Sequence, residues 1–324
     1  MQIFQKGIFN MSESEHSIIK YSKINHLKFY IISIRYRYPH LHNAFELSII
    51  LDGTLQLKLN NRILTAHPGD IILLNPNEVH ELSCLNGYVT MLSAQISVNF
   101  CQEYFPSWKH TVFLTSSVKK ALTHTQKKEL LDLLFQSALS YWDSFPTSIY
   151  HCIGLSCFLI ELFFRFIPHR ELSDSEIAAE QKNIKRLSRI LSFIEQHYAE
   201  KNILSRLAEQ ENVTITYMSH FFHDNFHLSF RNYLNNYRFE KAMQLLTTTN
   251  LSVLDICISV GFNDYKIFNQ LCQQTYHCSA KECRKITLQS GQQQTEQHPL
   301  TNQYMFSSEE SLNYMSQFQL SKIL

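Results

Sequence analysis

The sequence predicts an α+β protein, with an N-terminal antiparallel β-barrel and trailing helices followed by an all-α C-terminal region. Three observations lead to this prediction. Residues 18–100 are rich in Ile, Leu and Val and are broken by turn signals. Residues 118–168 change to the apolar spacing of helices, and residues 184–285 repeat one helix–turn–helix pattern. A chain of 324 residues is long enough for two such domains.

Composition places the chain among globular proteins. It is 44% hydrophobic and 18% charged, and its formal net charge is +1. A net charge this small gives no overall field that would attract nucleic acid or a membrane. Charge is unevenly spread, however, since residues 181–288 hold 13 Lys and Arg against 9 Asp and Glu, an excess of four.

The N-terminal residues and the cysteines predict a cytoplasmic protein. The start lacks the uninterrupted apolar region of a secretory signal. The eight cysteines include no CxxC pair, so we expect reduced thiols in a reducing compartment. The most apolar segment, 149–168, carries Glu161 and Arg165 four residues apart, where they can pair on a helix. Because charges are costly in lipid, we expect a buried amphipathic helix and no membrane partner.

The first region carries the period of half-buried strands. In "TLQLKLN", Leu55, Leu57 and Leu59 alternate with polar residues. The pairs "DG" at 52–53 and "NN" at 60–61 suit hairpin turns, because Gly and Asn tolerate positive φ. Several short strands at this spacing predict an antiparallel barrel or sandwich.

Apolar spacing and polar stretches set the expected boundaries. Leu130, Leu134 and Ala138 lie on one face of a helix that follows the barrel. The polar, Gln-rich C-terminal segment predicts disorder, with a weak amphipathic patch near 312–324 that could dock on the protein. The expected parts are a barrel with trailing helices at 18–168, a linker at 169–183, a helical domain at 184–287 and a disordered tail at 288–324.

Residues 184–285 contain two copies of one pattern. Each copy consists of a short helix, a tight turn and a second helix with an aromatic stripe. In the first copy, Asn202 is expected to cap the short helix and Thr214 the second one. The inward stripe is expected to contain Tyr217, Met218, Phe221 and Phe222.

The second copy carries the same signals. Ser252, with Asp255 three residues later, resembles a capping box. Gly261 supplies the turn, and Asn263 or Asp264 caps the next helix. The expected inward residues of that helix are Ile267, Phe268 and Leu271.

A long amphipathic segment, 229–249, joins the copies. At about 1.5 Å per residue, some 18 residues span roughly 27 Å. Such a spacer can hold two reading helices about one DNA turn, ~34 Å, apart. The second helix of a helix-turn-helix unit can enter the major groove, so the arrangement predicts a DNA-binding domain.

In these residues and their spacing, the C-terminal region resembles the AraC/XylS family of transcription regulators. The resemblance covers about 100 residues with matching order and gaps. It implies two helix-turn-helix units joined by a long helix. The matching residues are "LA" at 207–208, "YMS" at 217–219, "SF" at 229–230, Tyr233, Leu234, Arg238, Ala242, "LL" at 245–246, "GFND" at 261–264, Phe268 and Arg284.

The resemblance implies that the exposed faces of the two second helices read DNA. Polar side chains on these faces can reach base edges or phosphates, or can simply be solvated. The expected DNA contacts are Thr214, Thr216, Tyr217, Ser219, His220 and His223 in the first unit, and Asn263, Asp264, Lys266, Asn269, Gln270 and Gln273 in the second.

The chain departs from the family at several of these positions. Arg or Lys is usual at the positions held here by His220, His223, Gln270, Gln273 and Gln274. Fewer permanent cations release fewer counterions, so we expect weaker and less salt-sensitive binding. Histidines replace the glycines usual at 227 and 277, and Ala280 replaces a proline.

The first domain shows a cupin-like pattern, which many AraC-like regulators carry in front of their DNA-binding region. His40, His42 and Glu46 precede Gly53 with the expected spacing, and His80 lies downstream. His40 and His42, two residues apart on a strand, should point to the same side. Arg35 and Tyr38, on the preceding stretch, are candidates for contact with an anionic group and for stacking, although a register slip would reverse their face.

Two uses of this barrel remain open from the sequence. It could hold a small organic effector, such as a sugar or polar metabolite, at Arg35, Tyr38, His40, His42, Glu46 and His80. It could instead be a metal-dependent cupin enzyme fused to a DNA-binding module, since three imidazoles and a carboxylate suit a transition metal. The second cupin motif is degraded at Glu78, which favours the effector. A third interpretation is a constitutive DNA-binding protein whose barrel only dimerises and whose histidines are structural.

The favoured interpretation is therefore a regulator that is not an enzyme and needs no metal and no cofactor. Its expected partners are double-stranded DNA, a small-molecule effector and RNA polymerase. The helices at 126–168 are expected to join two copies into a homodimer. An effector that binds two domain arrangements with different affinity would shift the population able to meet DNA.

Overall fold

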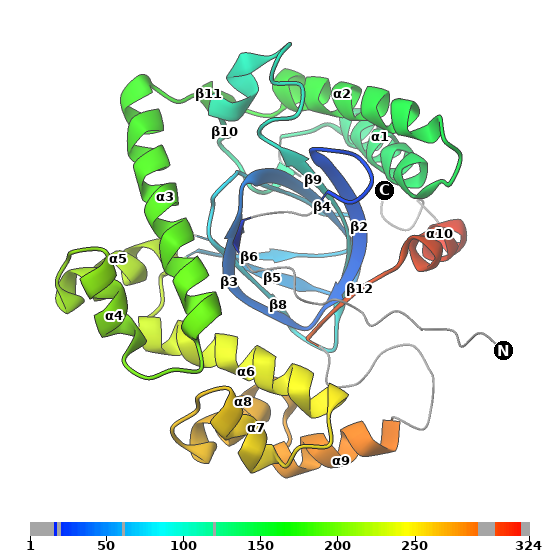
Figure 1. The fold of residues 1–324 in the computed structure, drawn as a ribbon. Helices are drawn as coiled ribbons and strands as arrows, with labels where there is room; N and C mark the ends of the chain where they lie inside the picture. Colours follow the sequence, from blue (N-terminus) through cyan, green and yellow to red (C-terminus); the bar gives the residue numbers. More distant parts are fainter. Residues whose placement is uncertain (1–15, 18–20, 60–61, 119–120, 291–301, 319–324) are drawn as a thin grey trace.

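The computed structural model describes residues 16–17, 21–59, 62–118, 121–290 and 302–318. Two five-stranded sheets curve around a shared interior, and Figure 1 views this barrel along its axis. The first sheet has the order β1 (His16–Ser17), β3 (Tyr36–His42), β8 (His80–Cys84), β5 (Leu55–Leu59), β6 (Arg62–Ala66). The second has the order β12 (Gln303–Met305), β2 (Leu27–Ile34), β9 (Val89–Ser97), β4 (Ala44–Asp52), β7 (Ile71–Leu74). With the helices that follow, this confirms the α+β fold class.

Alternation along β4 separates the two faces of the second sheet. Phe45, Leu47 and Ile49 belong to the apolar cluster shared with the following helices. Glu46 and Ser48 point the other way, because successive side chains of a strand lie on opposite faces. Both are buried, so the barrel interior contains polar as well as apolar side chains.

A helical hairpin covers the outer face of the second sheet (Figure 1). It consists of α1 (His124–Trp142), with a capping box at Thr123 and Gln126, and α2 (Ser148–Phe166). By length and hydropathy α2 could cross a membrane, and it is the one such helix among the described residues. Here it packs along α1, and Glu161 forms the expected ion pair with Arg165.

The expected linker at 169–183 is largely regular structure, so this prediction needs correction. Strand β11 (His169–Glu171) pairs with β10 (Thr111–Phe113), which follows the 3-10 helix η1 (Pro106–His110). Helix α3 (Asp174–His197) then begins ten residues earlier than expected. Ser173 and Glu176 form a complete capping box, a local signal that sequence reasoning missed.

The helical domain contains the two expected units, drawn in yellow-green to orange in Figure 1. Its elements are α4 (Ile203–Gln210), α5 (Ile215–Phe226), α6 (Phe230–Thr248), α7 (Val253–Ser259), α8 (Tyr265–Tyr276) and α9 (Ala280–Ser290). The caps at Thr214, Ser252 and Asp264 form as predicted. Asn202 is the N-cap of α4 but sits at φ 55° and makes no side-chain cap bond, which corrects that prediction.

Both second helices end in a left-handed residue. His227 has φ 53° and His277 has φ 57°. The backbone N–H of each donates to a carbonyl in the last turn of its helix. A glycine fits this conformation most easily, and histidine tolerates it better than bulky apolar residues do.

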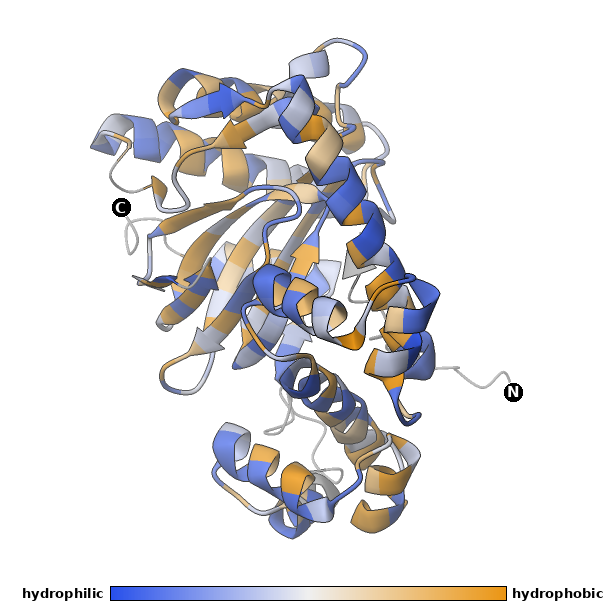
Figure 2. Cartoon of the chain, turned by 90° about the vertical axis from the view of Figure 1, so that its left-hand side faces the viewer, coloured by the Kyte–Doolittle hydropathy of each residue, from blue (hydrophilic) through white to orange (hydrophobic). Residues whose placement is uncertain are grey.

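The core of the first unit extends into the barrel. Tyr38 and Leu41, on β3, are buried in the same cluster as Phe222 and Tyr233 of the helical domain. The Tyr38 ring lies edge-on to Tyr233, with 5.5 Å between ring centroids. Figure 2 shows the helical domain lying next to the barrel.

The tail was predicted to be disordered, and its described part is not. Residues 303–305 form β12, which pairs antiparallel with the edge of β2, and α10 (Ser308–Gln317) packs against α1. Pairing with an edge strand satisfies the backbone N–H and C=O groups of a segment of any composition. A polar composition was therefore a poor guide to disorder here. Residues 291–301 and 319–324, including part of the expected amphipathic patch, lie outside the described residues.

Candidate DNA-binding surface and effector site

Helix α5 presents a polar face opposite its buried stripe. Met218, Phe222 and Phe226, four residues apart, are buried against the rest of the first unit. This spacing turns the candidate contacts Thr214, Thr216, Ser219, His220 and His223 away from the core, where all but the half-buried Ser219 are exposed.

Tyr217 is better described as an exposed side chain packed at the edge of the unit than as part of the inward stripe. It is 46% exposed, and its hydroxyl accepts a hydrogen bond from Arg186 of α3 at 2.9 Å. Phe221 is only half-buried. The inward stripe thus differs from the predicted one at two of its four positions.

Helix α8 repeats the arrangement with a shifted stripe. Its buried residues are Phe268, Cys272 and Tyr276, whereas Ile267 and Leu271 are half-buried. Of the predicted contacts in this unit, Asn263, Asp264, Lys266, Gln270 and Gln273 are exposed.

Asn269 and Asp264 have structural contacts of their own. The Asn269 side-chain oxygen accepts the backbone N–H of Ala280 at 3.0 Å, which ties α8 to the start of α9. The Asp264 carboxylate accepts the backbone N–H of Lys266 at 2.8 Å. For these two residues a structural contact accompanies any role at DNA.

Two arginines that match the family pattern fix the long helix α6. Arg238 is buried and donates to the carbonyl oxygens of Tyr198 and Glu200 at 2.7 and 2.8 Å. Arg284 donates to the carbonyl oxygens of Leu246 and Thr249 at the C-terminal end of α6. Sequence reasoning noted both arginines without assigning these roles, because their acceptors lie 35 to 40 residues away.

Four candidate effector residues meet inside the barrel. The ring centroids of His40 and His80 are 4.1 Å apart, and those of His42 and His80 are 5.0 Å apart. His42 Nε2 lies 2.9 Å from Glu46 Oε2, within ion-pair distance when the imidazole is protonated. Within the described part of the chain, no three His, Cys, Asp or Glu residues are arranged to hold a metal ion.

Polar neighbours surround Glu46. Gln95 Nε2 donates to its carboxylate at 2.8 Å, and the hydroxyls of Tyr30 and Ser48 donate at 3.2 and 3.1 Å. Burial alone would raise the pKa of Glu46, but the hydrogen bond and charge of His42 outweigh it and hold the pKa below its usual range. The carboxylate is therefore kept ionised inside the barrel.

Burial has the opposite consequence for two of the imidazoles. It lowers the pKa of His80 to about 3 and holds the pKa of His40 well below its ordinary value. The Nδ1 atoms of His40 and His80 lie 3.0 and 2.8 Å from the carbonyl oxygens of Tyr38 and Glu78. A carbonyl only accepts, so each Nδ1 carries the hydrogen and each neutral Nε2 is left as an acceptor.

Tyr38 and Arg35 do not join this interior group. The β3–β8 register shifts between Arg37 and His40, and this bulge turns Tyr38 outward against α6 while His40 and His42 face inward. Arg35 lies at the barrel rim, with its guanidinium 4.8 Å from the Tyr88 ring centroid and 5.4 Å from that of Tyr276. The predicted set is thus divided between the barrel interior and the boundary with the helical domain.

Two paired helix-turn-helix units behind a barrel with a polar interior define a DNA-binding regulator with a ligand-binding domain. Comparisons agree: residues 207–286 match the model of a helix-turn-helix domain, and residues 27–90 match that of an AraC-like ligand binding domain. Together the two matches support an AraC family regulator with an N-terminal ligand-binding domain.

Several known proteins align with this chain along most of their length. The regulator YdiP of Escherichia coli (strain K12) is 23% identical over 266 residues, which is 76% of this chain and 80% of that protein. The Msm operon regulatory protein of Streptococcus mutans is 23% identical over 254 residues, 76% of this chain and 86% of that protein. The solved structure of ToxT from Vibrio cholerae is 13% identical, with a TM-score of 0.45, and covers 80% of this chain and 98% of ToxT. Because the relatives are named regulators, the comparisons do not support the alternative of a metal-dependent enzyme.

Proposed function

We propose that this protein controls transcription by placing α5 and α8 in successive major grooves of one promoter. The observation that supports it is the pair of capped helices, each with one buried stripe and one exposed polar face, joined by α6. The 19 residues of α6 extend about 28 Å, which suits two grooves one DNA turn apart.

Selection of bound DNA from a random pool tests this proposal. We expect one enriched sequence with two half-sites about 10 base pairs apart. Thr216→Ala should weaken binding about 5- to 100-fold and relax specificity in one half-site, whereas Lys266→Ala should weaken binding to all sequences alike. Thr125→Ala and Lys128→Ala, at exposed positions of α1, are the matched controls. Enrichment of no sequence by the folded full-length chain would refute the proposal.

We further propose a small polar effector, such as a sugar, inside the barrel in the cytoplasm. His40, His42, Glu46 and His80 supply buried hydrogen-bonding groups there, and His80 Nε2 has no hydrogen-bond partner among the described residues. A buried group without a partner costs about 1–3 kcal/mol, so an effector hydroxyl that met it would gain affinity. Binding with unequal affinity to two domain arrangements would then change DNA occupancy.

A homodimer through the helical hairpin is part of the same proposal. The hairpin leaves the large apolar side chains of Leu139, Phe145, Tyr150 and Phe158 exposed, and a second copy packed on the hairpin would cover them. Phe158→Asp is expected to convert a dimer into a monomer in sedimentation experiments. Ile63→Asp, at an equally exposed position of β6, should leave the mass unchanged. A wild-type chain that sediments as a monomer would contradict the prediction.

RNA polymerase is the remaining partner that we propose. Leu254 and Ile258 of α7 are exposed on the second unit and could meet the enzyme while α8 is on DNA. This surface is separate from the polar face of α8.

A further inference from the structure

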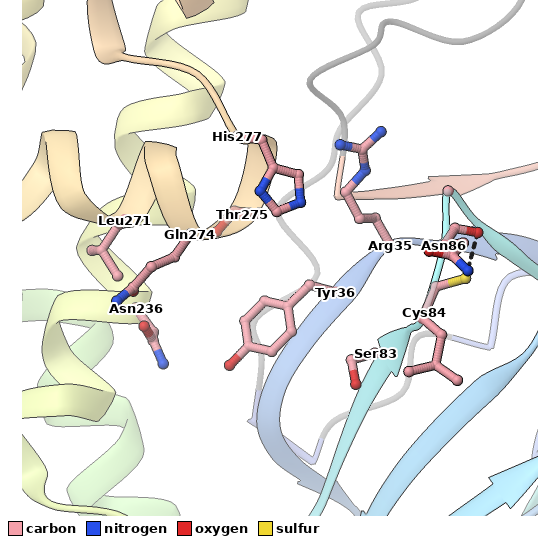
Figure 3. A pocket seen from close by; sticks show the side chains of 12 residues that line it. Arg35, Tyr36, Ser83, Cys84, Asn86, Asn236, Leu271, Gln274, Thr275 and His277 are labelled. Carbon is pink, nitrogen blue, oxygen red and sulfur yellow. Dashed lines mark hydrogen bonds between the residues drawn. The ribbon is translucent and has the colours of Figure 1, made fainter.

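A polar cleft lies between the barrel and the second helix-turn-helix unit (Figure 3). It consists of two hollows of about 510 and 420 Å³. Both are lined by Tyr36, Asn236, Leu271 and Gln274, so they adjoin one another. Each has the size of sites that hold small molecules.

Arg35 lies at one end of the cleft, where its guanidinium is restrained by neighbouring rings and its Nε has no acceptor among the described residues. The Arg35 guanidinium is stacked near the rings of Tyr88 and Tyr276, which restrict its plane. Its Nε is buried and has no hydrogen-bond partner within the described ranges. Figure 3 shows Arg35 and His277 on facing walls. A planar guanidinium matches the geometry of carboxylate and phosphate groups.

Side-chain amides line the rest of the cleft. Each amide offers both donors and an acceptor, the combination that pairs with hydroxyl groups. Lys58 and Glu81 add no net charge, because they form an ion pair at 3.6 Å. Apolar walls are confined to a few aliphatic side chains such as Leu85 and Leu271. The amide residues are Asn86, Asn232, Asn235, Asn236, Gln270 and Gln274.

We propose that this cleft binds a small polyhydroxylated anion, such as a phosphorylated sugar. Arg35 and His277 receive its anionic group, and the amides receive its hydroxyls. Arg35 belongs to the barrel, whereas Gln274 and His277 lie at the end of α8. A ligand that touches both therefore holds α8 against the barrel and lowers its availability to DNA. This regulatory consequence rests on the proposed function, but ligand binding itself does not.

Calorimetric titration of the full-length protein tests the site. The probes are glucose 6-phosphate, inorganic phosphate and glucose. We expect saturable binding of glucose 6-phosphate, at least tenfold weaker binding of phosphate, and no heat from glucose. Absence of binding by both phosphate-containing probes up to 10 mM would overturn the proposal.

Variants locate the binding. Arg35→Gln and His277→Asn should each weaken glucose 6-phosphate binding at least tenfold, and asparagine tolerates the positive φ at position 277. Arg62→Gln, on the exposed start of β6, removes the same charge elsewhere and should bind like wild type. If both cleft variants fold and bind like wild type, or if Ser93→Ala in the barrel interior abolishes binding instead, the assignment is wrong. DNA selection without any sugar phosphate reports on the proposed function separately.

Discussion

Replacing Gly261 by alanine is expected to destabilise the second helix-turn-helix unit by about 2–6 kcal/mol. Gly261 has φ 87°, and a Cβ there would lie 2.4 Å from the carbonyl oxygen of Ala199. A non-glycine residue in this conformation costs roughly 1–3 kcal/mol, and forced overpacking costs about as much again. Because Ala199 follows α3, the clash would separate the two units, and sequence-specific DNA binding should be lost. Thermal unfolding and DNA titration measure both effects.

Gly154 offers a matched control within the same chain. It lies inside α2, and no heavy atom comes within 4 Å of the place that a Cβ would occupy, so an added methyl group meets open space. Gly154→Ala should therefore stabilise the protein by about 0.5–1 kcal/mol through helix propensity. Equal unfolding temperatures for Gly261→Ala and the wild type would contradict the close approach of the two units.

Acidification from pH 6.5 towards pH 4 is expected to destabilise the barrel steeply. The folded-state pKa of His80 is about 3, whereas an unfolded histidine titrates near ~6.5. Between these values the unfolded chain binds a proton that the folded chain excludes, so stability falls as pH falls, by up to about 1.4 kcal/mol per pH unit. His40, whose pKa is lowered as well, adds a loss in the same direction.

Glu46 extends this loss to lower pH. Its folded-state pKa is held below the ordinary value, so its contribution is present above the unfolded pKa of ~4.3 and is lost as pH falls further. Urea unfolding measured from pH 7.5 to 4 gives the slope. His80→Gln should reduce the slope of unfolding free energy against pH by the amount that one bound proton contributes. His67→Gln, at an exposed turn, should leave the slope unchanged. Identical slopes for wild type and His80→Gln would refute a neutral buried His80.

Local signals predicted the helices of the two helix-turn-helix units well. The caps at Thr214, Ser252 and Asp264 and the buried Met218 and Phe268 depend on residues three or four apart, which a sequence displays directly. The capping box at residues 173–176 was equally visible, and attention to it would have extended α3 into the expected linker.

Features that depend on distant pairing could not be predicted in the same way. The bulge in β3 arises from its pairing with β8, some 40 residues later, and it decides that Tyr38 faces α6 while His40 faces the interior. The placement of Arg35 requires Tyr276, and the order of residues 303–305 requires the free edge of β2. In each case the partner lies far along the chain, where periodicity carries no information.

The return of β12 to the barrel has a mechanical consequence. Asn302 accepts a hydrogen bond from the Tyr276 hydroxyl at 2.8 Å, and its carbonyl oxygen accepts the backbone N–H of Arg35, also at 2.8 Å. The DNA-binding domain is thus attached to the barrel at both of its ends, through α3 and through β12. Two attachment points, together with the core that Tyr38 shares with Tyr233, restrict rotation of this domain more than a single connection would. Truncating the chain before residue 302 would remove the second attachment and leave the domain held through α3 and its contacts with β3.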